Sequence, residues 1–446
     1  MSSQIAIELN DSGIIVSDGQ QVLQNSPGYI IDVAGHEWIG EEARNRAYLH
    51  PNECKNNFWS ELAQSQNPIV DNANVKLALR HLSSVWQPVS GNIQAVILIV
   101  PANFTKTGLG LLLGICKQLS IPVRAMIHQA VLVPKQSNHT GLTVHLDMQL
   151  HHTAITHVVE SNNEFSVSTT EVLDDTGFEA IYTAAAEYIA KAFISANRLD
   201  PMHSAELEQQ LFDYLPTWLE QAQSVSNVNC QLNYQNNRYE TTVSADGLNA
   251  IITAKLSEIF HVLQSLDQSQ TLIVCVTDVL DKQFGFNQYA HQHGIMVRKL
   301  PVGFHAHQSL MHVDLLLNDD EQIYLNKQLP YIVVTDSLLQ PERNSSELLE
   351  QAATHIVFRY RAYPILDAVY VYENSIEGLD LQNEQSGGSK KELFVIRKNL
   401  TRTVMTIVSG ENIQVNAEHL SSEMMLVIGD CLQVGEHELM LIKVEC

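Results

Sequence analysis

The sequence predicts an α/β protein of two similar lobes, each with a mixed sheet and helices, followed by a small all-β domain. Two observations predict this organisation. A hairpin pattern followed by alternating strands and helices occurs twice before residue 325, which is typical of repeated α/β units. Short apolar runs then follow one another closely, as in a β-sandwich or barrel. We therefore expect a two-lobed domain at residues 1–325 and a β-rich domain at residues 326–446.

The first lobe begins with a predicted β-hairpin. Ile5–Leu9 and Ile14–Ser17 are β-runs, and Asn10–Gly13 between them is turn material. A polar, loop-rich stretch follows. The apolar spacing then predicts a helix, a buried strand, a second helix and a second strand, at 74–86, 96–100, 106–119 and 123–127.

The second lobe is predicted to repeat this plan. Three β-runs are expected at 142–146, 152–159 and 165–169, before two helices at about 177–197 and 205–222. Two further strands, a helix and two buried strands follow, at 230–233, 239–243, 245–266, 271–276 and 296–300.

The last part of the chain differs in having little helical pattern. Short strands are predicted at 356–359, 368–372, 393–398, 403–408, 412–415, 425–428 and 438–444. This spacing is typical of an all-β sandwich or barrel.

The net charge excludes one class of partner. The chain carries 26 Lys and Arg against 50 Asp and Glu, a formal net charge of −24, so it lacks the basic surface with which proteins bind phosphate backbones. We expect no nucleic-acid partner. The acidic excess is interpreted first as a solvated surface, with a basic protein partner as the sharper alternative.

The compartment is predicted from what the sequence lacks. Apolar runs such as Ala95–Val100 are far shorter than the roughly 20 residues of a membrane span. Met1–Glu8 has neither the basic start nor the apolar stretch of a signal peptide. The six cysteines lie far apart without a Cys-x-x-Cys pair, which favours reduced thiols. We therefore expect a cytoplasmic protein with no membrane partner.

Five segments occur in the order of a known family. They are Ile5–Gly13, Val100–Phe104, Ile121–Ile127, Val144–Asp147 and Leu272–Val276. They resemble segments of the DnaK-type heat-shock chaperones, a branch of the actin-like ATPase superfamily. In order, the family segments are the first phosphate hairpin, the "VPANF" segment, the strand before the "NEP" turn, the second phosphate hairpin and the adenosine-loop strand. The resemblance covers about the first 310 residues. It implies an actin-like ATPase fold, with ATP held between the two hairpins in a deep cleft.

The first hairpin keeps only part of the family pattern. Glu8 matches the acidic residue, and Ser12 stands for a threonine. Asn10, however, takes the place of a glycine, and Asp11 takes the place of a second threonine. Because an additional carboxylate repels phosphate, Asp11 argues against nucleotide binding.

The second hairpin departs further. Asp147 matches the family aspartate, but Gln149, Leu150, His151 and His152 stand where the family has a glycine triplet and a threonine. Backbone N–H groups reach a phosphate closely only where side chains are small. We therefore expect bulky side chains to occupy the phosphate position.

Three other family positions are also altered. Glu61 takes the place of the lysine that contacts the γ-phosphate, and Gln129 takes the place of the "NEP" glutamate. Thr277 and Asp278 stand where the adenosine loop needs glycines. Phosphoryl transfer depends on positioning and charge neutralisation, so these losses predict that ATP hydrolysis is gone and that nucleotide binding is weak or absent.

The resemblance thus predicts a relic nucleotide cleft without catalytic residues. Its candidate residues are Glu8, Asn10, Asp11, Ser12, Glu61, Gln129, Asp147, Gln149, Thr277 and Asp278. No cofactor is expected, although ATP with Mg²⁺ held by Glu8, Asp11 and Asp147 remains an alternative to turn and capping roles for these carboxylates. The histidine pairs 151/152, 291/293 and 305/307 lack the partners of a tetrahedral site, so no metal is expected.

The C-terminal segments Ile413–Leu420 and Val427–Gly435 resemble the closing strands of a forkhead-associated domain. Phosphothreonine readers of that family need an Arg and a Ser on recognition loops, and neither can be assigned here. A β-sandwich that docks another protein is therefore favoured over a phosphopeptide reader.

Two functions remain open at the level of sequence. The first is a non-catalytic, DnaK-like protein that acts as a protein-interaction, scaffold or chaperone-like module. The alternative is a divergent chaperone ATPase whose phosphate contacts come from His151, His152 or Lys55.

Overall fold

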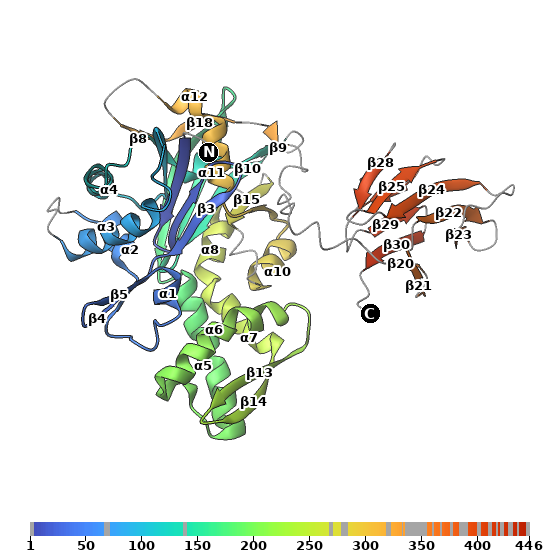
Figure 1. Ribbon diagram of the computed structural model, residues 1–446, viewed down its shortest axis with the longest axis horizontal. Coiled ribbons are helices and arrows are strands. Elements are labelled where there is room, and N and C mark those ends of the chain that lie inside the picture. The colour runs from blue at the N-terminus through green and yellow to red at the C-terminus, as the bar shows by residue number, and fades with distance from the viewer. Residues whose placement is uncertain are drawn as a thin grey trace. The chain divides into compact units, whose positions relative to one another are not determined.

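In the computed structural model the chain divides into two compact units, Met1–Gln340 and Pro341–Cys446 (Figure 1). The first unit is mixed α/β with several sheets, which confirms the α/β class predicted from the sequence. The structure describes residues 4–66, 72–136, 141–266, 271–277, 284–317, 323–331, 333–334, 355–358, 361–365, 368–374, 378–382, 391–398, 403–408, 413–415, 418–419, 423–426, 431–434 and 437–442.

The first sheet has the strand order β17-β8-β7-β1-β2-β3. β1 (Gln4–Asn10), β2 (Gly13–Ser17) and β3 (Val22–Pro27) form an antiparallel meander. β7 (Ala95–Val100), β8 (Val123–His128) and β17 (Leu325–Asn326) continue the sheet in parallel. Every residue of β7 is buried, as expected for a central parallel strand covered on both faces.

The second sheet repeats this arrangement. β10 (Leu142–Met148), β11 (His152–Ser161) and β12 (Glu164–Asp174) are antiparallel, and β15 (Leu272–Thr277) and β16 (Met296–Leu300) join β10 in parallel. β18 (Gln328–Pro330) pairs with β12 at the other edge. Each sheet thus begins with a hairpin whose first strand is continued by parallel strands, three in the first sheet and two in the second.

Helices cover the outer face of each sheet. α2 (Phe58–Ala63), α3 (Ala73–Trp86) and α4 (Lys106–Gln118) lie together beside the first sheet in Figure 1 and share its core. The helices that share the core of the second sheet are α5 (Phe178–Asn197), α6 (Ala205–Gln221), α7 (Ala245–Lys255), α8 (Ser257–Ser265) and α10 (Phe284–Gln292). The single helix predicted at 245–266 is divided into α7 and α8. Leu256 is the C-cap of α7 and the N-cap of α8.

Smaller elements complete the first unit. β4 (Ile30–Val33), β5 (His36–Ile39) and β6 (Cys54–Lys55) form a three-stranded sheet next to α1 (Glu41–Arg44), within the stretch predicted to be loop-rich. The remaining elements are η1 (Gln129–Leu132), β9 (Lys135–Gln136), η2 (Pro201–His203), the hairpin β13 (Asn227–Tyr234) and β14 (Asn237–Ser244), α11 (Phe304–Met311), α12 (Val313–Leu316) and β19 (Val333–Val334).

A separate apolar core lies between the two sheets. It contains Ala6 and Ile99 from the first sheet, Phe165 and Cys275 from the second, and Phe304 from α11. On β1 the alternate residues Ile5, Ile7 and Leu9 belong instead to the core under α2–α4. The period-two alternation of a strand therefore gives each sheet an outer face covered by helices and an inner face toward the other sheet.

The chain returns to both sheets after α12. Leu325–Asn326 pairs with β8, and Gln328–Pro330 pairs with β12. The first compact unit consequently extends to Gln340, beyond the boundary predicted at residue 325. These strands were not predicted, because they are only two or three residues long.

The second unit is described through strands alone. A six-stranded sheet has the order β21-β20-β30-β29-β26-β27, and a five-stranded sheet has the order β23-β22-β24-β25-β28. The bounds are β20 (His355–Phe358), β21 (Arg361–Pro364), β22 (Ala368–Asn374), β23 (Gly378–Gln382), β24 (Glu392–Lys398), β25 (Thr403–Ile407), β26 (Ile413–Val415), β27 (Glu418–His419), β28 (Glu423–Leu426), β29 (Cys431–Val434) and β30 (His437–Ile442). One core is shared by Ile356 and Leu439 of the six-stranded sheet and by Val371 and Phe394 of the five-stranded sheet. Two sheets around one core are typical of a sandwich.

Within the described part of the chain, no helix is both long enough and apolar enough to cross a membrane.

The core between the sheets should carry much of the stability of the first unit. Phe165 is 1% exposed in this core, so Phe165→Ala should lower the free energy of unfolding by about 3 to 5 kcal/mol. Val159→Ala is the matched control, because Val159 is 43% exposed, and its effect should stay within about 0.5 kcal/mol. Urea denaturation measures both. Equal effects of the two substitutions would contradict the assignment of this core.

Candidate functional site

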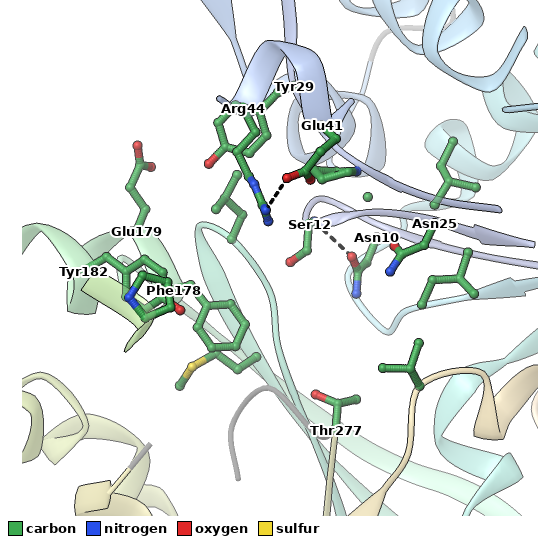
Figure 2. A pocket seen from close by; sticks show the side chains of 18 of the residues that line it. Asn10, Ser12, Asn25, Tyr29, Glu41, Arg44, Phe178, Glu179, Tyr182 and Thr277 are labelled. Atoms are coloured by element: carbon green, nitrogen blue, oxygen red, sulfur yellow. Dashed lines mark hydrogen bonds and ion pairs between the residues drawn. The ribbon is translucent and has the colours of Figure 1, made fainter. Parts of the chain in front are cut away.

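A cavity of about 840 Å³ lies in the first unit, where both hairpins end (Figure 2). The first hairpin contributes Asn10 and Ser12, and the second contributes Asp147 and Leu150. Thr277, at the end of β15, lies on the opposite side of the cavity from Arg44 in the view of Figure 2. The volume is within the range of small-molecule sites, about 300 to 1,000 Å³.

The two hairpins are joined by the side chain of Asp11. Its Oδ1 accepts the backbone N–H of Leu150 at 2.6 Å, and its Oδ2 accepts the N–H of His151 at 3.1 Å. Asp11 is 2% exposed. Two successive backbone N–H groups directed at one anion form the kind of cradle that also binds phosphate. Here the anion is a carboxylate of the protein itself.

The second hairpin is held from the other side by helix α5. The N–H groups of Phe178 and Glu179 donate to the carbonyl oxygens of Gln149 and Leu150, both at 3.0 Å. Gly177 permits this contact, because a Cβ atom there would lie 2.3 Å from the Leu150 oxygen. Two donors of the first turn of α5 are therefore used within the protein.

The histidines of the second hairpin pair with carboxylates. His151 Nδ1 lies 2.7 Å from Glu179 Oε2, and although burial opposes its charge, Glu179 and Asp11 raise the pKa of His151. His152 Nε2 lies 3.4 Å from Asp11 Oδ2 without hydrogen-bond alignment. Burial is the largest influence on Asp11 and raises the pKa of its carboxyl, while His152 and the Leu150 N–H act in the opposite direction.

Glu8 is directed toward the inner side of the first sheet by the alternation of β1, in which Ala6 also faces the core between the sheets. Its Oε1 accepts the Gln129 amide at 3.1 Å and lies 2.9 Å from Nδ1 of His305 on α11. The His305 ring meets that of His145 edge-on, with centroids 5.2 Å apart. Burial lowers the pKa of His145 well below its ordinary value, so its ring is neutral.

Asp147 occupies the matching inner position on β10, since Val144 and Leu146 belong to the core of the outer face. Its Oδ2 accepts the Gln149 amide at 2.7 Å, and the Gln149 Oε1 in turn accepts from Asn103 at 3.4 Å. Burial raises the pKa of Asp147 to about 7. The Gln149 hydrogen bond opposes this change, and Glu8 adds to it.

Several buried polar atoms at the cavity have no hydrogen-bond partner within the described structure. Four of them belong to residues that line it: Glu8 Oε2, Ser12 Oγ, Asp147 Oδ1 and His305 Nε2. Unpaired buried polar atoms are rare in folded proteins, because each costs about 1 to 3 kcal/mol. Their concentration here makes the cavity the candidate functional site.

The mouth of the cavity is aromatic and acidic. Tyr29, Tyr48, Phe178, Tyr182 and Phe212 contribute rings. Tyr48 stacks on Phe212 with ring centroids 3.9 Å apart. Figure 2 shows the Arg44 side chain reaching toward the cavity from the side of Tyr29, with its guanidinium bound to Glu41 at 2.6 Å. Arg44 is the only Lys or Arg among the described residues of the lining.

Most of the predicted cleft residues meet at this cavity. Glu8, Asn10, Ser12, Asp147 and Thr277 line it. Asp11, Gln129 and Gln149 are buried and bonded to its residues. Glu61 is exposed on α2 and does not line the cavity. Asp278 lies outside the described residues.

The bulky side chains of the second hairpin are directed to other residues. The side chain of His151 is directed to Glu179 and that of Gln149 to Asp147, so the amides of the second hairpin are met by the carboxylate of Asp11 rather than by bulky neighbours. Residues such as Tyr182 and Asp213 were missed in the sequence, because they lie on helices whose pattern indicates only packing.

In the part of the chain that the structure describes, no group of three or more His, Cys, Asp and Glu side chains is arranged to hold a metal ion. No known protein family model matches the chain, and a comparison with curated proteins gives no match.

Asp147 should make stability fall with rising pH. Its carboxyl has a pKa of about 7 in the folded protein and 3.8 ordinarily, so between these values the folded state holds a proton that the unfolded chain has released. Asn keeps the oxygen that accepts from Gln149 but carries no charge. Above pH 7, Asp147→Asn should therefore raise the free energy of unfolding, by up to about 4 kcal/mol for a gap of about three pH units.

The measurement is urea denaturation of both proteins from pH 4 to pH 8. The gain in Asp147→Asn should shrink toward pH 4, where the unfolded chain of the natural protein also begins to hold the proton. A gain that is the same at both ends of this range would contradict the assignment of this titration to Asp147.

Proposed function

We propose that this chain is a non-catalytic, DnaK-like protein that serves as a protein-interaction or scaffold module. The carrying observation is the Asp11 carboxylate, which accepts the Leu150 and His151 N–H groups. These are donors that a phosphate group would need in this arrangement. A nucleotide would have to displace a buried carboxylate and approach two others, Glu8 and Asp147.

The actin-like fold is supported by the repeated strand order. In each sheet an antiparallel meander is extended by parallel strands on the side of its first strand, three in the first sheet and two in the second. The two hairpins that open these sheets meet at one cavity, as the family resemblance implies. Fold alone does not establish function, so the proposal depends on the chemistry of the cavity.

That chemistry is unfavourable for phosphoryl transfer. Five carboxylates line the cavity against a single Arg, which is already paired with Glu41. A triphosphate is stabilised in enzymes by cations and backbone donors. With these absent or engaged, the cavity repels the substrate of an ATPase. The remaining role for the preserved two-sheet frame is contact with another protein, through the cavity or the β-rich second unit.

Calorimetric titration of the full chain with Mg-ATP and with Mg-ADP tests the proposal. We expect no saturable heat at micromolar to millimolar nucleotide and no phosphate release above buffer, because the anion position is filled. Micromolar affinity for either nucleotide would overturn the proposal. Turnover that disappears in Asp147→Ala would establish the alternative, a divergent ATPase.

The alternative is supported by Arg44, which reaches toward the cavity. The residues considered for this role in the sequence are otherwise engaged. His151 pairs with Glu179, and His152 lies against Asp11. The exposed Lys55 donates to the carbonyl of Asn52 at 3.1 Å. Phosphate contacts in such an ATPase would therefore depend mainly on Arg44.

Removing the carboxylate should uncover the anion cradle. In Asp11→Ala the Leu150 and His151 N–H groups lose their acceptor, which should lower stability by about 1 to 3 kcal/mol. Added inorganic phosphate should then raise the melting temperature of the variant but not of the natural protein. Asp11→Asn, which keeps an acceptor oxygen, is the control and should gain little. If phosphate stabilises all three proteins equally, Asp11 does not occupy an anion site.

A further inference from the structure

We propose that the cavity binds a protonated amine or a guanidinium on an apolar stem, as in the side chain of a lysine or arginine. This inference rests on the proposed function in one respect: the cavity is not occupied by a nucleotide. It adds the chemical class of the ligand that the cavity recognises.

The charges of the lining favour a cation. Its carboxylates are Glu8, Glu41, Asp147, Glu179 and Asp213. Arg44 pairs with Glu41, and His151 pairs with Glu179. Asp213 accepts only an uncharged amide, that of Gln209 at 2.8 Å, among the contacts of the described residues. The lining therefore keeps an excess of negative charge, which attracts cations and repels anions.

The unpaired atoms specify what the ligand must supply. Asp147 and Glu8 are 2% and 7% exposed, and each has one carboxylate oxygen without a hydrogen-bond partner within the described structure. His305 Nδ1 lies 2.9 Å from Glu8 Oε1, and its Nε2 also has no hydrogen-bond partner within the described structure. A ligand that satisfies the two carboxylate oxygens must bring N–H donors. An ammonium brings three, a guanidinium brings five, and neither is an acceptor.

The mouth of the cavity suits the rest of such a ligand. Figure 2 shows Phe178 and Tyr182 together on one side and Tyr29 next to Arg44 above them. Aromatic rings attract a cation through their faces and pack against the methylene groups behind it. A neutral apolar ligand would fit the rings but leave the buried oxygens unpaired, which is costly. The cavity is large enough for a side chain with its flanking backbone.

Calorimetric titration of the full chain tests this inference with two charged probes. One is a blocked Ala-Ala-Lys-Ala-Ala peptide, and the other is the free diamine cadaverine. The neutral control is the same peptide with an acetylated lysine. We expect saturable binding of at least one charged probe and none of the acetylated peptide. Peptide binding identifies a partner protein as the source of the cation, whereas binding of cadaverine alone identifies a small amine.

Two variants distinguish binding in the cavity from non-specific attraction of cations to the acidic chain. Asp147→Asn should lower the affinity for the charged probe about tenfold or more, since it removes a buried charge that faces the ligand. The same variant should melt at a higher temperature, which distinguishes lost binding from misfolding. Glu61→Gln removes one charge from the exposed face of α2, outside the lining, and should leave the affinity unchanged.

Affinity should also rise with pH. The charged and titratable groups that face Asp147 are Glu8 on β1, Asp11 in the first hairpin and His305 on α11. Because the pKa of Asp147 is about 7, a bound cation should favour its ionised form and release a proton. Titrations in two buffers with different heats of ionisation measure that release.

Three results would overturn the inference. The first is no saturable binding of either charged probe. The second is equal binding of the charged and acetylated peptides. The third is equal weakening by Asp147→Asn and Glu61→Gln. Nucleotide titration remains a separate readout, because a chain that binds neither Mg-ATP nor an amine retains the proposed function and loses only this inference.

Discussion

The carboxylate of Asp11 accepts the N–H groups of Leu150 and His151, and this contact fixes the first hairpin against the second. In both sheets an antiparallel meander is joined to parallel strands through its first strand, and the sheets share a core on their inner faces, so their hairpins are brought to one place by the fold. What occupies the space between the hairpins then decides the chemistry of the cavity. A protein carboxylate in the anion cradle makes that chemistry acidic and closes the position that a phosphate would need.

The buried carboxylates at the cavity lower the stability of the folded protein. Glu8, Asp11 and Asp147 bring three carboxylates into a buried region, and burial raises the pKa of Asp11 and Asp147. A stable core of the same shape would use neutral or apolar side chains at these positions. Retained charges with unpaired oxygens are typical of sites where function competes with stability. In this chain we propose that the competing function is recognition of a cation.

The sequence predicted the features that local patterns encode. Hairpins around polar turns and buried apolar runs such as Ala95–Val100 determine strands through nearby residues alone, and the repeated order predicted the repeated sheets. The bridge from Asp11 to Leu150 spans 139 residues, and no local signal reveals such a partner. The added carboxylate was recognised as unfavourable for phosphate, but its role as the occupant of the cradle required the structure. α11 was also not predicted from the sequence, because this helix is short and packs between the sheets.

Amide hydrogen exchange at Leu150 and His151, followed by NMR on the full chain with and without Mg-ATP, is the most direct measurement. If Asp11 holds these amides in the folded protein, both exchange slowly, and neither their rates nor their chemical shifts change when Mg-ATP is added. Rapid exchange in the free protein, with protection and shifted resonances on addition of Mg-ATP, would show that the cradle is open to a nucleotide and would contradict this account.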